Sequence, residues 1–487
     1  MSNSTTASAP ASGRIKSQNK PSFYVHFAIT LLLMFGLRFT PHPALITDTG
    51  WQVIGVFLGV IYGWNFLDSI PVSILGIIAI GMTDYISMDS AILNGFGNNI
   101  VMMIFIACTF IAIVSKSGVC ELIADRMLNM KIMKTHPWLA VFVFFFVNQV
   151  LGAFTSNSAI LLLFWAVFAD VCTAKNIKKG KFTTYIMAGL CFTALAATIS
   201  FFFKAAQFLG LYQSLTGETL DPLRVSIFFW ILNEIMLILY VLVGKYVLRI
   251  DAAPFAGASI SLVENKHMTP YQKLCLGSMF VFLFLMFVPS FLPSSWWFTQ
   301  VVAKLGNGGV CLLCLVFFFF GKFEGAPRPG KILSESAPWN IYFMLACVMV
   351  VANAVRNEEL GIVAWIEQFF APIFTGHGSL FFIAMILIIP LFLTNFFNNI
   401  ATGFIFIPLA VTFAPQLGVS YAALSACLCF SCSMGLFTPA AGYFGALFFS
   451  KPDWLSVKDC RFYGVICFLI SGVTLLIAGY PLASLLL

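Results

Sequence analysis

The sequence predicts an all-α integral membrane protein with about 11 transmembrane helices and two re-entrant helical hairpins, arranged as two inverted repeats. Three observations support this fold class. The chain has 487 residues, of which 60% are hydrophobic and only 9% are charged, a composition unlike that of a soluble domain. Two polar triplets interrupt long apolar stretches at positions 242 residues apart. Finally, Lys and Arg fall mostly on one side of the expected spans.

The apolar stretches give the spans in order. A bilayer core needs about 20 apolar residues per helix. Spans are therefore expected near 22–40, 47–63, 69–84, 98–118, 183–213, 224–248, 272–292, 296–320, 338–356, 418–448 and 462–486. Two further stretches, 137–171 and 378–413, are too long for one span and too short for two. Each carries its polar triplet at the centre, so each is expected to form a re-entrant hairpin buried in protein.

The segments outside the spans divide the chain. Residues 1–21 are rich in Ser, Ala and Thr and predict a disordered cytoplasmic tail. The apolar run that follows ends in RFTPHPAL, a poor signal-peptide cleavage site, so no cleaved leader is expected. Residues 249–271 are polar and are expected to link the first transmembrane repeat, 22–248, to the second, 272–487.

The positive residues test this layout. With the N-terminus in the cytoplasm, most of the 26 Lys and Arg residues fall on the cytoplasmic side. Arg38, Arg224, Lys304 and Arg356 fall outside, and Lys204 lies within a span. This is the positive-inside bias. We therefore expect a multi-pass protein of the cell inner (plasma) membrane with a cytoplasmic N-terminus. The net charge of +7 reports topology, and no nucleic-acid partner is expected.

An internal repeat supports the inverted arrangement. FGNNIVMMIFIACTFIAIVSKSGV precedes the first hairpin, and PWNIYFMLACVMVVANAVRNEELGIV precedes the second. Their glycines, Gly118 and Gly361, are 243 residues apart, close to the triplet separation. The layout enters the first hairpin from the cytoplasm and the second from outside, so the two tips should meet near the membrane midplane. Paired interruptions of this kind indicate the binding site of a transporter.

The triplets are the first candidate binding residues for a small anion. They are Ser156, Asn157 and Ser158 in the first hairpin, and Asn398, Asn399 and Ile400 in the second. Amide, hydroxyl and backbone N–H groups donate to carboxylate oxygens, and the N-terminus of a helix attracts anions. Alternatively, Ser and Asn hold the hairpins against neighbouring helices. Their pairing at equivalent repeat positions favours the binding role.

Several motifs, taken in chain order, resemble the divalent anion/sodium symporter (DASS) family, within the wider ion transporter superfamily. LDSIP at 67–71 is similar to the family's E-A-I-P segment, and FGNNIVMMIF and PWNIYFML are similar to span starts in its two halves. TNFFNNIAT at 394–402 follows the pattern T-x-F-x-S-N-T-A-T, and Thr438-Pro439 resembles the T-P-P-N break.

The resemblance implies a homodimeric elevator carrier for di- or tricarboxylates or sulfate, usually driven by sodium. Thr438 and Pro439 would line its site, although an ordinary proline kink is the alternative reading. If sodium binds, its expected place is near Asn157, Asn399 and Thr402. Apart from Na⁺ as a coupling ion, no cofactor is expected.

The chain also departs from the DASS pattern. The run 198–207 lacks the glycines of the family's G-G-x-G-T break and contains Phe-Phe-Phe followed by Lys204. A glycine-free run is expected to unwind less readily. An ionisable residue inside a span is a functional hypothesis by default. Lys204 is expected to act as a counter-charge for the anion or as a replacement for sodium; snorkelling to the interface is the alternative.

No nucleophile–base pair, zinc motif or phosphate loop occurs in a polar segment long enough to form an enzyme domain, so an enzyme is not expected. The sequence favours a secondary transporter of small di- or tricarboxylates by elevator-type alternating access, with reduced or no sodium dependence through exchange or proton coupling. The alternatives are a sodium-coupled dicarboxylate or sulfate symporter, and an anion channel. A channel would need a polar stripe through several spans.

Overall fold

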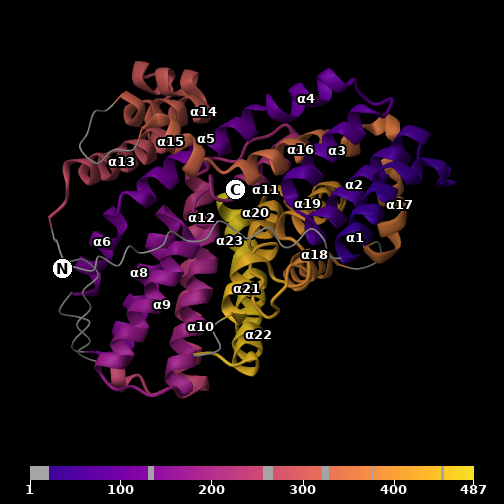
Figure 1. Cartoon of the computed structure of the whole chain (residues 1–487). Coiled ribbons are helices and arrows are strands. Elements are labelled where there is room, and N and C mark those ends of the chain that lie inside the picture. Colours follow the sequence, from indigo (N-terminus) through magenta and orange to yellow (C-terminus); the bar gives the residue numbers. More distant parts are fainter. Residues whose placement is uncertain (1–20, 130–135, 256–266, 321–327, 375–377, 451–453) are drawn as a thin grey trace.

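The structure is a computed structural model that describes residues 21–129, 136–255, 267–320, 328–374, 378–450 and 454–487 (Figure 1). Every regular element in these residues is helical, which confirms the all-α fold class. The predicted tail, apart from Pro21, and residues 256–266 of the predicted linker lie outside the described residues. The repeat boundaries predicted from the sequence therefore remain predictions.

The α-helices run in chain order as α1 (Pro21–Leu31), α2 (Asp48–Phe66), α3 (Ser69–Gly81), α4 (Met88–Phe96), α5 (Asn99–Lys116), α6 (Val119–Leu128), α8 (Pro137–Phe154), α9 (Asn157–Ala174), α10 (Lys181–Ala196), α11 (Ala206–Thr216), α12 (Pro222–Leu242), α13 (Pro270–Phe291), α14 (Trp297–Phe320), α15 (Pro329–Ser336), α16 (Trp339–Arg356), α17 (Ile362–Phe374), α18 (Ser379–Leu393), α19 (Asn399–Phe413), α20 (Tyr421–Ser431), α21 (Gly442–Phe449), α22 (Val457–Thr474) and α23 (Tyr480–Leu486).

Nine helical segments within the described ranges are long and apolar enough to cross a bilayer, or ten if the bent α14 counts as one span. The predicted number of 11 therefore remains a prediction. Four helices were not expected from the sequence: α4, α6, α15 and α17. α14 bends at Gly306, whose φ of 61° is readily adopted only by glycine.

A hairpin followed by a broken helix occurs twice. α8 and α9 form the first hairpin, and α10 and α11 are the two parts of the broken helix that follows. α18 and α19 form the second hairpin, followed by α20 and α21, with a break between Ser431 and Gly442. Before each hairpin, a glycine with positive φ follows a long helix: Gly118 at 75° after α5 and Gly361 at 71° after α16. These equivalent features agree with the internal repeat read from the sequence.

The expectation that the Phe-rich run resists unwinding was wrong. After α10, a short 3-10 turn spans Ala197–Ile199, and the chain stays non-helical until α11 begins. α12 supplies the hydrogen bonds that the missing helix would have made. Asn233 Nδ2 donates to the Ile199 carbonyl at 2.8 Å, and Ser226 Oγ accepts from the Phe202 amide at 3.2 Å. A neighbouring helix thus re-satisfies the freed backbone groups in place of glycine flexibility.

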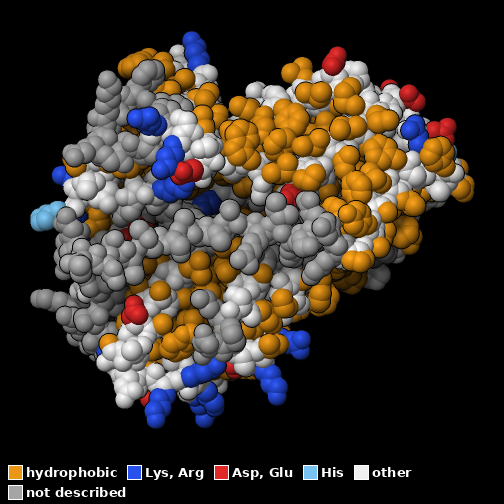
Figure 2. All heavy atoms as spheres, viewed as in Figure 1, with side chains coloured by type: hydrophobic (Ala, Val, Ile, Leu, Met, Phe, Trp, Pro, Cys, Tyr) orange, Lys and Arg blue, Asp and Glu red, His pale blue; other side chains and the backbone are white. Residues whose placement is uncertain are grey.

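Figure 1 shows how the helices are grouped. α8, α9, α10, α12 and α22 run lengthwise beside one another in the lower part of the view, whereas α2, α3 and α16 gather at the right. α11 continues the broken helix that begins with α10 and packs against α16 and α19, so it connects the first group to the second. Figure 2 shows Lys and Arg side chains along the lower edge, where α9, α10 and α22 have an end, and hydrophobic side chains over the broad right-hand face.

Candidate functional site

Both hairpin tips line one cavity of about 540 Å³. The first tip contributes Ser156, Asn157 and Ser158, and the second contributes Asn398 and Asn399. The break between α10 and α11 contributes Lys204, and further walls come from α5, α16 and the start of α21. Six of the eight residues predicted to bind substrate therefore meet here, although they come from segments far apart in the chain. Thr438 and Pro439 do not line this cavity.

The cavity has a single charged side chain among its described lining residues, and that side chain is Lys204. The other polar lining residues are neutral: Thr155, Ser156, Asn157, Ser158, Thr198, Gln207, Asn398, Asn399 and Ser433. The lining residues that the structure describes include no carboxylate, so the electrostatic potential in the cavity is positive. A site of this kind attracts anions, and the low dielectric around it strengthens that attraction.

Lys204 is held by the first hairpin tip. Its Nζ donates to the Gly152 carbonyl at 3.1 Å, to the Thr155 carbonyl at 2.8 Å and to Asn157 Oδ1 at 2.9 Å. An ammonium group has three N–H donors, so all three are used on protein oxygens. Two of these oxygens belong to the C-terminal end of α8, where a positive charge is favoured by the helix dipole. Lys204 therefore points inward and does not snorkel to an interface.

The two hairpin tips differ in capping. Asn398 caps α19, because its Oδ1 accepts from the amides of Ile400 at 2.9 Å and Ala401 at 3.4 Å. Ser156 stands at the same place before α9 but makes no such cap. Its hydroxyl instead lies 3.1 Å from Ser158 Oγ. The first-turn amides of α9 are thus left without a side-chain acceptor beside Lys204, and an anion is a suitable partner for them.

Asn395 holds the second hairpin to the break that follows α20. It is fully buried, and its Oδ1 accepts from the amides of Leu436 at 2.7 Å and Phe437 at 3.0 Å. Thr438 Oγ1 donates to the Asn395 carbonyl. Thr438 therefore fastens the break to the hairpin rather than facing the cavity, and Pro439 is exposed.

Two further polar residues connect the tips to helices outside the hairpins. Ser115 Oγ on α5 accepts from the Ser156 amide at 3.4 Å, and Asn65 Oδ1 on α2 accepts from the Asn398 amide at 2.8 Å. The sequence analysis did not single out either residue. The available signal was a polar residue inside or at the end of an apolar run, which is too common to identify a contact with a tip.

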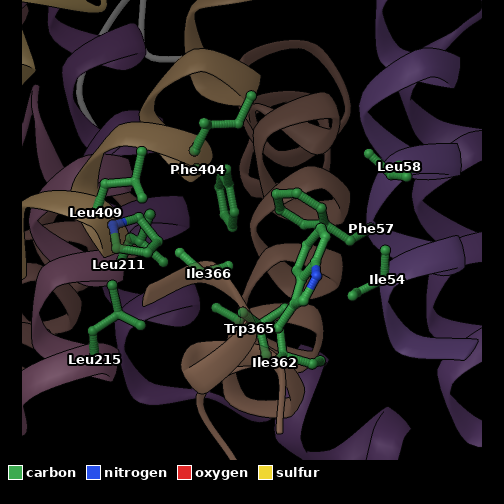
Figure 3. Close-up of a pocket in the computed structure, with 14 residues that line it drawn as sticks. Ile54, Phe57, Leu58, Leu211, Leu215, Ile362, Trp365, Ile366, Phe404 and Leu409 are labelled. Atoms are coloured by element: carbon green, nitrogen blue, oxygen red, sulfur yellow. The ribbon is translucent and has the colours of Figure 1, made fainter. Parts of the chain in front are cut away.

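A second cavity, of about 200 Å³, lies between α2, α11, α16, α17 and α19 (Figure 3). Figure 3 shows Phe57, Trp365 and Phe404 around it. All the residues that line it are hydrophobic. Among these lining residues no side chain is charged, and the Trp365 indole N–H is the one side-chain donor, so the polar cavity at the hairpin tips remains the candidate site.

Paired hairpins, broken helices and a positively charged cavity within an apolar bundle define a membrane transporter. A sequence model described as "Citrate transporter" (CitMHS) matches residues 51–431. Because that match covers most of the chain, the protein belongs to the citrate transporter family. The protein is therefore a multi-pass membrane transporter of the carboxylate type and not an enzyme. The expected DASS-type carrier is confirmed at this level.

Individual relatives agree in class. The chain is 22% identical over 425 residues to the sodium-dependent dicarboxylate transporter SdcS of Staphylococcus saprophyticus, which covers 81% of this chain and 77% of that protein. Two solved structures are similar in fold alone. The Alcanivorax borkumensis YdaH transporter has a TM-score of 0.56 at 13% identity and covers 90% of this chain and 97% of its own. Neisseria gonorrhoeae MtrF, described as illuminating a class of antimetabolite efflux pumps, has a TM-score of 0.54 at 14% identity and covers 94% of each chain.

Proposed function

We propose that this protein is a secondary carrier of small di- or tricarboxylates in which the Lys204 ammonium takes the place of a coupling sodium ion. The observation that carries the proposal is the set of three oxygens around Lys204 Nζ: two carbonyls from the end of α8 and one amide oxygen from Asn157. In many transporters such helix-end and unwound carbonyls coordinate the transported cation. Here a tethered cation fills that position, so transport does not require sodium.

The cavity suits a compact polyanion. Its volume of about 540 Å³ falls within the usual range of about 300–1,000 Å³ for small-molecule sites. Lys204 supplies positive charge, while the uncapped amides of α9 and the side chains of Ser158, Asn157 and Asn399 supply donors. The Lys204 donors are already occupied, so the lysine acts on the anion through its charge and the tip donors make the direct contacts.

The proposal also covers the transport mechanism, the oligomeric state and the membrane. The hairpins, their broken helices and α12, which packs against the first hairpin and holds its break, move as one body against α2, α5, α16 and α17 in an elevator-type cycle. The apolar surfaces around the second cavity (Figure 3) support such sliding, because apolar contacts do not fix one register. The setting is a homodimer in the inner (plasma) membrane, with the N-terminus in the cytoplasm, as the distribution of Lys and Arg favours.

Sodium-coupled symport of a dicarboxylate or sulfate is the second candidate, because the relative SdcS is named sodium-dependent. Its ion would lie near the second tip. There, Thr394 Oγ1 lies 2.8 Å from Asn399 Oδ1, but its single proton is directed to the Cys432 carbonyl in a shorter contact. The Asn398 carbonyl accepts from Thr402 Oγ1 at 3.1 Å, and the Asn395 carbonyl accepts from Thr438. These two carbonyls already have protein donors, which disfavours a cation there.

Uptake by the purified protein in proteoliposomes tests the proposal. Labelled citrate, succinate and sulfate are supplied in sodium or choline buffer, with or without the same unlabelled anion inside. We expect saturable carboxylate counterflow in choline buffer. Uptake that occurs only with sodium would favour the second candidate. Flux that does not saturate and needs no internal anion would favour an anion channel.

A further inference from the structure

A carboxyl group lies within the hairpin-bearing part of the molecule, away from the cavity. Glu234 is near the middle of α12, whose ends are Pro222 and Leu242, and its side chain is half-buried. Gln149, on α8 of the first hairpin, donates from Nε2 to Glu234 Oε1 at 3.1 Å. A carboxyl group at membrane depth is costly and marks a functional position by default. Neither Glu234 nor Gln149 lines the candidate site.

The hydrogen bonding of Gln149 bears on the protonation of Glu234. Gln149 is fully buried, and among the described residues its Oε1 has no hydrogen-bond donor. An ionised carboxylate only accepts, so it leaves that amide oxygen unsatisfied. A protonated carboxyl group donates its O–H back to Gln149 Oε1 and closes a ring of two hydrogen bonds. If the amide is rotated by 180°, its oxygen faces Glu234 Oε1, and that contact requires the same proton.

The neighbours of Glu234 offer no counter-ion. α12 packs against α8, α10, α13, α22 and α23. α8 and α23 contain no charged residue, and the charged residues of the other elements lie at helix ends. They are Lys181, Arg224, Lys245, Lys273, Lys458, Asp459 and Arg461. The other titratable groups on these elements are tyrosines and cysteines, which never carry a positive charge: Tyr185, Cys191, Tyr240, Tyr246, Tyr271, Cys275, Cys460, Tyr463, Cys467 and Tyr480. No described residue forms an ion pair with Glu234.

We propose that Glu234 and Gln149 form a proton-binding site that couples anion uptake to proton entry. The proposal rests on the proposed function and assigns its driving ion. A proton from the outer solution binds to Glu234 Oε2, travels with the anion and is released to the cytoplasm. No other bond forms or breaks.

The fixed charge of Lys204 explains why the proton matters. Gln149 and the oxygens that hold Lys204 belong to the first hairpin, and α12, which carries Glu234, packs against α8 of that hairpin, so in the proposed cycle Glu234 and Lys204 move together. A bound di- or tricarboxylate already outweighs the single positive charge of Lys204, so Glu234 crosses in its neutral form and adds no further negative charge. When the site is empty, loss of the proton leaves Glu234 negative and balances the lysine. The empty carrier returns readily only in this deprotonated form, since uncompensated charge at membrane depth is costly.

The test separates exchange from proton-driven net uptake. Proteoliposomes containing wild type, Glu234→Gln or Glu234→Asp receive labelled citrate in sodium-free buffer, with the membrane potential clamped. One set contains internal citrate at equal pH, and the other is anion-free inside with an acidic outer buffer. We expect both uptake modes in wild type and Glu234→Asp. Glu234→Gln should retain counterflow but lose the acceleration by the pH gradient, which allows up to about tenfold accumulation per pH unit for one proton per anion. The acidic buffer changes the protonation of citrate equally for wild type, Glu234→Gln and Glu234→Asp, so a difference between these proteins reports Glu234.

Glu359 is a solvent-exposed acid, and Glu359→Gln is the matched control, which should behave as wild type. An equal gradient response in wild type and Glu234→Gln overturns the proposal, and so does a wild type without any response. Absence of counterflow in wild type refutes the proposed function instead. In that case, or if Glu234→Gln loses its fold, the infrared spectrum of wild type and Glu234→Asp decides. A protonated-carboxyl band at neutral pH that shifts with the substitution supports the site, and its absence overturns it.

Discussion

Replacing Lys204 by Thr removes the tethered cation while leaving a side chain that hydrates easily. In sodium-free buffer we expect Lys204→Thr to lose most of its carboxylate transport. The wild type should transport equally well with and without sodium. The Gly152 and Thr155 carbonyls and Asn157 Oδ1 then lack their donor. Because the pocket they face is polar, water or sodium can take the place of the ammonium.

The magnitude follows from the geometry. The ammonium lies in the cavity wall, so an anion beside it is separated by about 6 Å. At an effective dielectric constant of about 20, one pair of unit charges at that separation contributes about 3 kcal/mol. The substitution should therefore weaken anion binding roughly 100-fold. Saturating sodium should recover part of this loss, because it brings one positive charge back to the same three oxygens.

Two assays measure the effect. Initial rates of labelled citrate uptake are recorded across a sodium titration for wild type, Lys204→Thr and the exposed control Lys304→Thr. Melting temperatures in sodium and choline chloride report cation binding without transport. A cation at ten times its dissociation constant stabilises the fold by about 1.4 kcal/mol, so sodium should stabilise Lys204→Thr but not the other two proteins.

A wild type whose uptake rises steeply with sodium, with the same dependence in Lys204→Thr, would refute this reasoning. Such a result means that Lys204 does not occupy the cation position. A loss of uptake in Lys304→Thr equal to that in Lys204→Thr would also count against it, because the effect would then be one of general surface charge.

Three further outcomes are expected. Asn157→Ala and Asn399→Ala should each abolish uptake while the protein still elutes as a folded species on size-exclusion chromatography, since a desolvated carboxylate loses a donor; near-normal rates in both would remove them from the site. Cysteines placed at 176–181 should react with an impermeant thiol reagent only from the cytoplasm, and those at 216–220 only from outside; labelling of both from one face contradicts the inverted layout. Gly361→Ala should destabilise the protein by at least about 1 kcal/mol in thermal unfolding, because φ is 71° and a Cβ would lie 1.9 Å from a backbone carbonyl oxygen; an unchanged melting temperature contradicts this.

The hairpins and the gathering of their tips were accessible from sequence because each depends on a local pattern. A polar triplet inside an apolar stretch can lie at membrane depth only where protein surrounds it. A second local pattern is Asp68 directly before Ser-Ile-Pro, a typical start of a helix, where its carboxylate caps α3 by accepting from the Ile70 amide at 3.0 Å. In both cases the feature and its cause lie within a few residues of each other.

The features that escaped prediction depend on contacts between distant segments. The Phe-rich run unwinds because Asn233 and Ser226 of α12 supply its hydrogen bonds. No residue within the run 198–207 indicates that α12 will supply these partners. Lys204 was recognised as important, but its orientation toward the hairpin required the fold. Glu234 was overlooked because a single carboxyl group in an apolar helix has no periodic signature, and its partner Gln149 lies 85 residues away.

The difference in capping between the two tips has a consequence for how the carrier moves. The α19 tip contains its own acceptor in Asn398, so its first-turn amides are capped without cargo. The α9 tip has none, so a bound anion supplies the missing acceptor and rigidifies residues 156–159. Amide hydrogen exchange should therefore slow at the first tip on addition of citrate and stay constant at the second. Binding of the anion should therefore change the rigidity of the first tip alone, while the second tip keeps the same rigidity throughout the transport cycle.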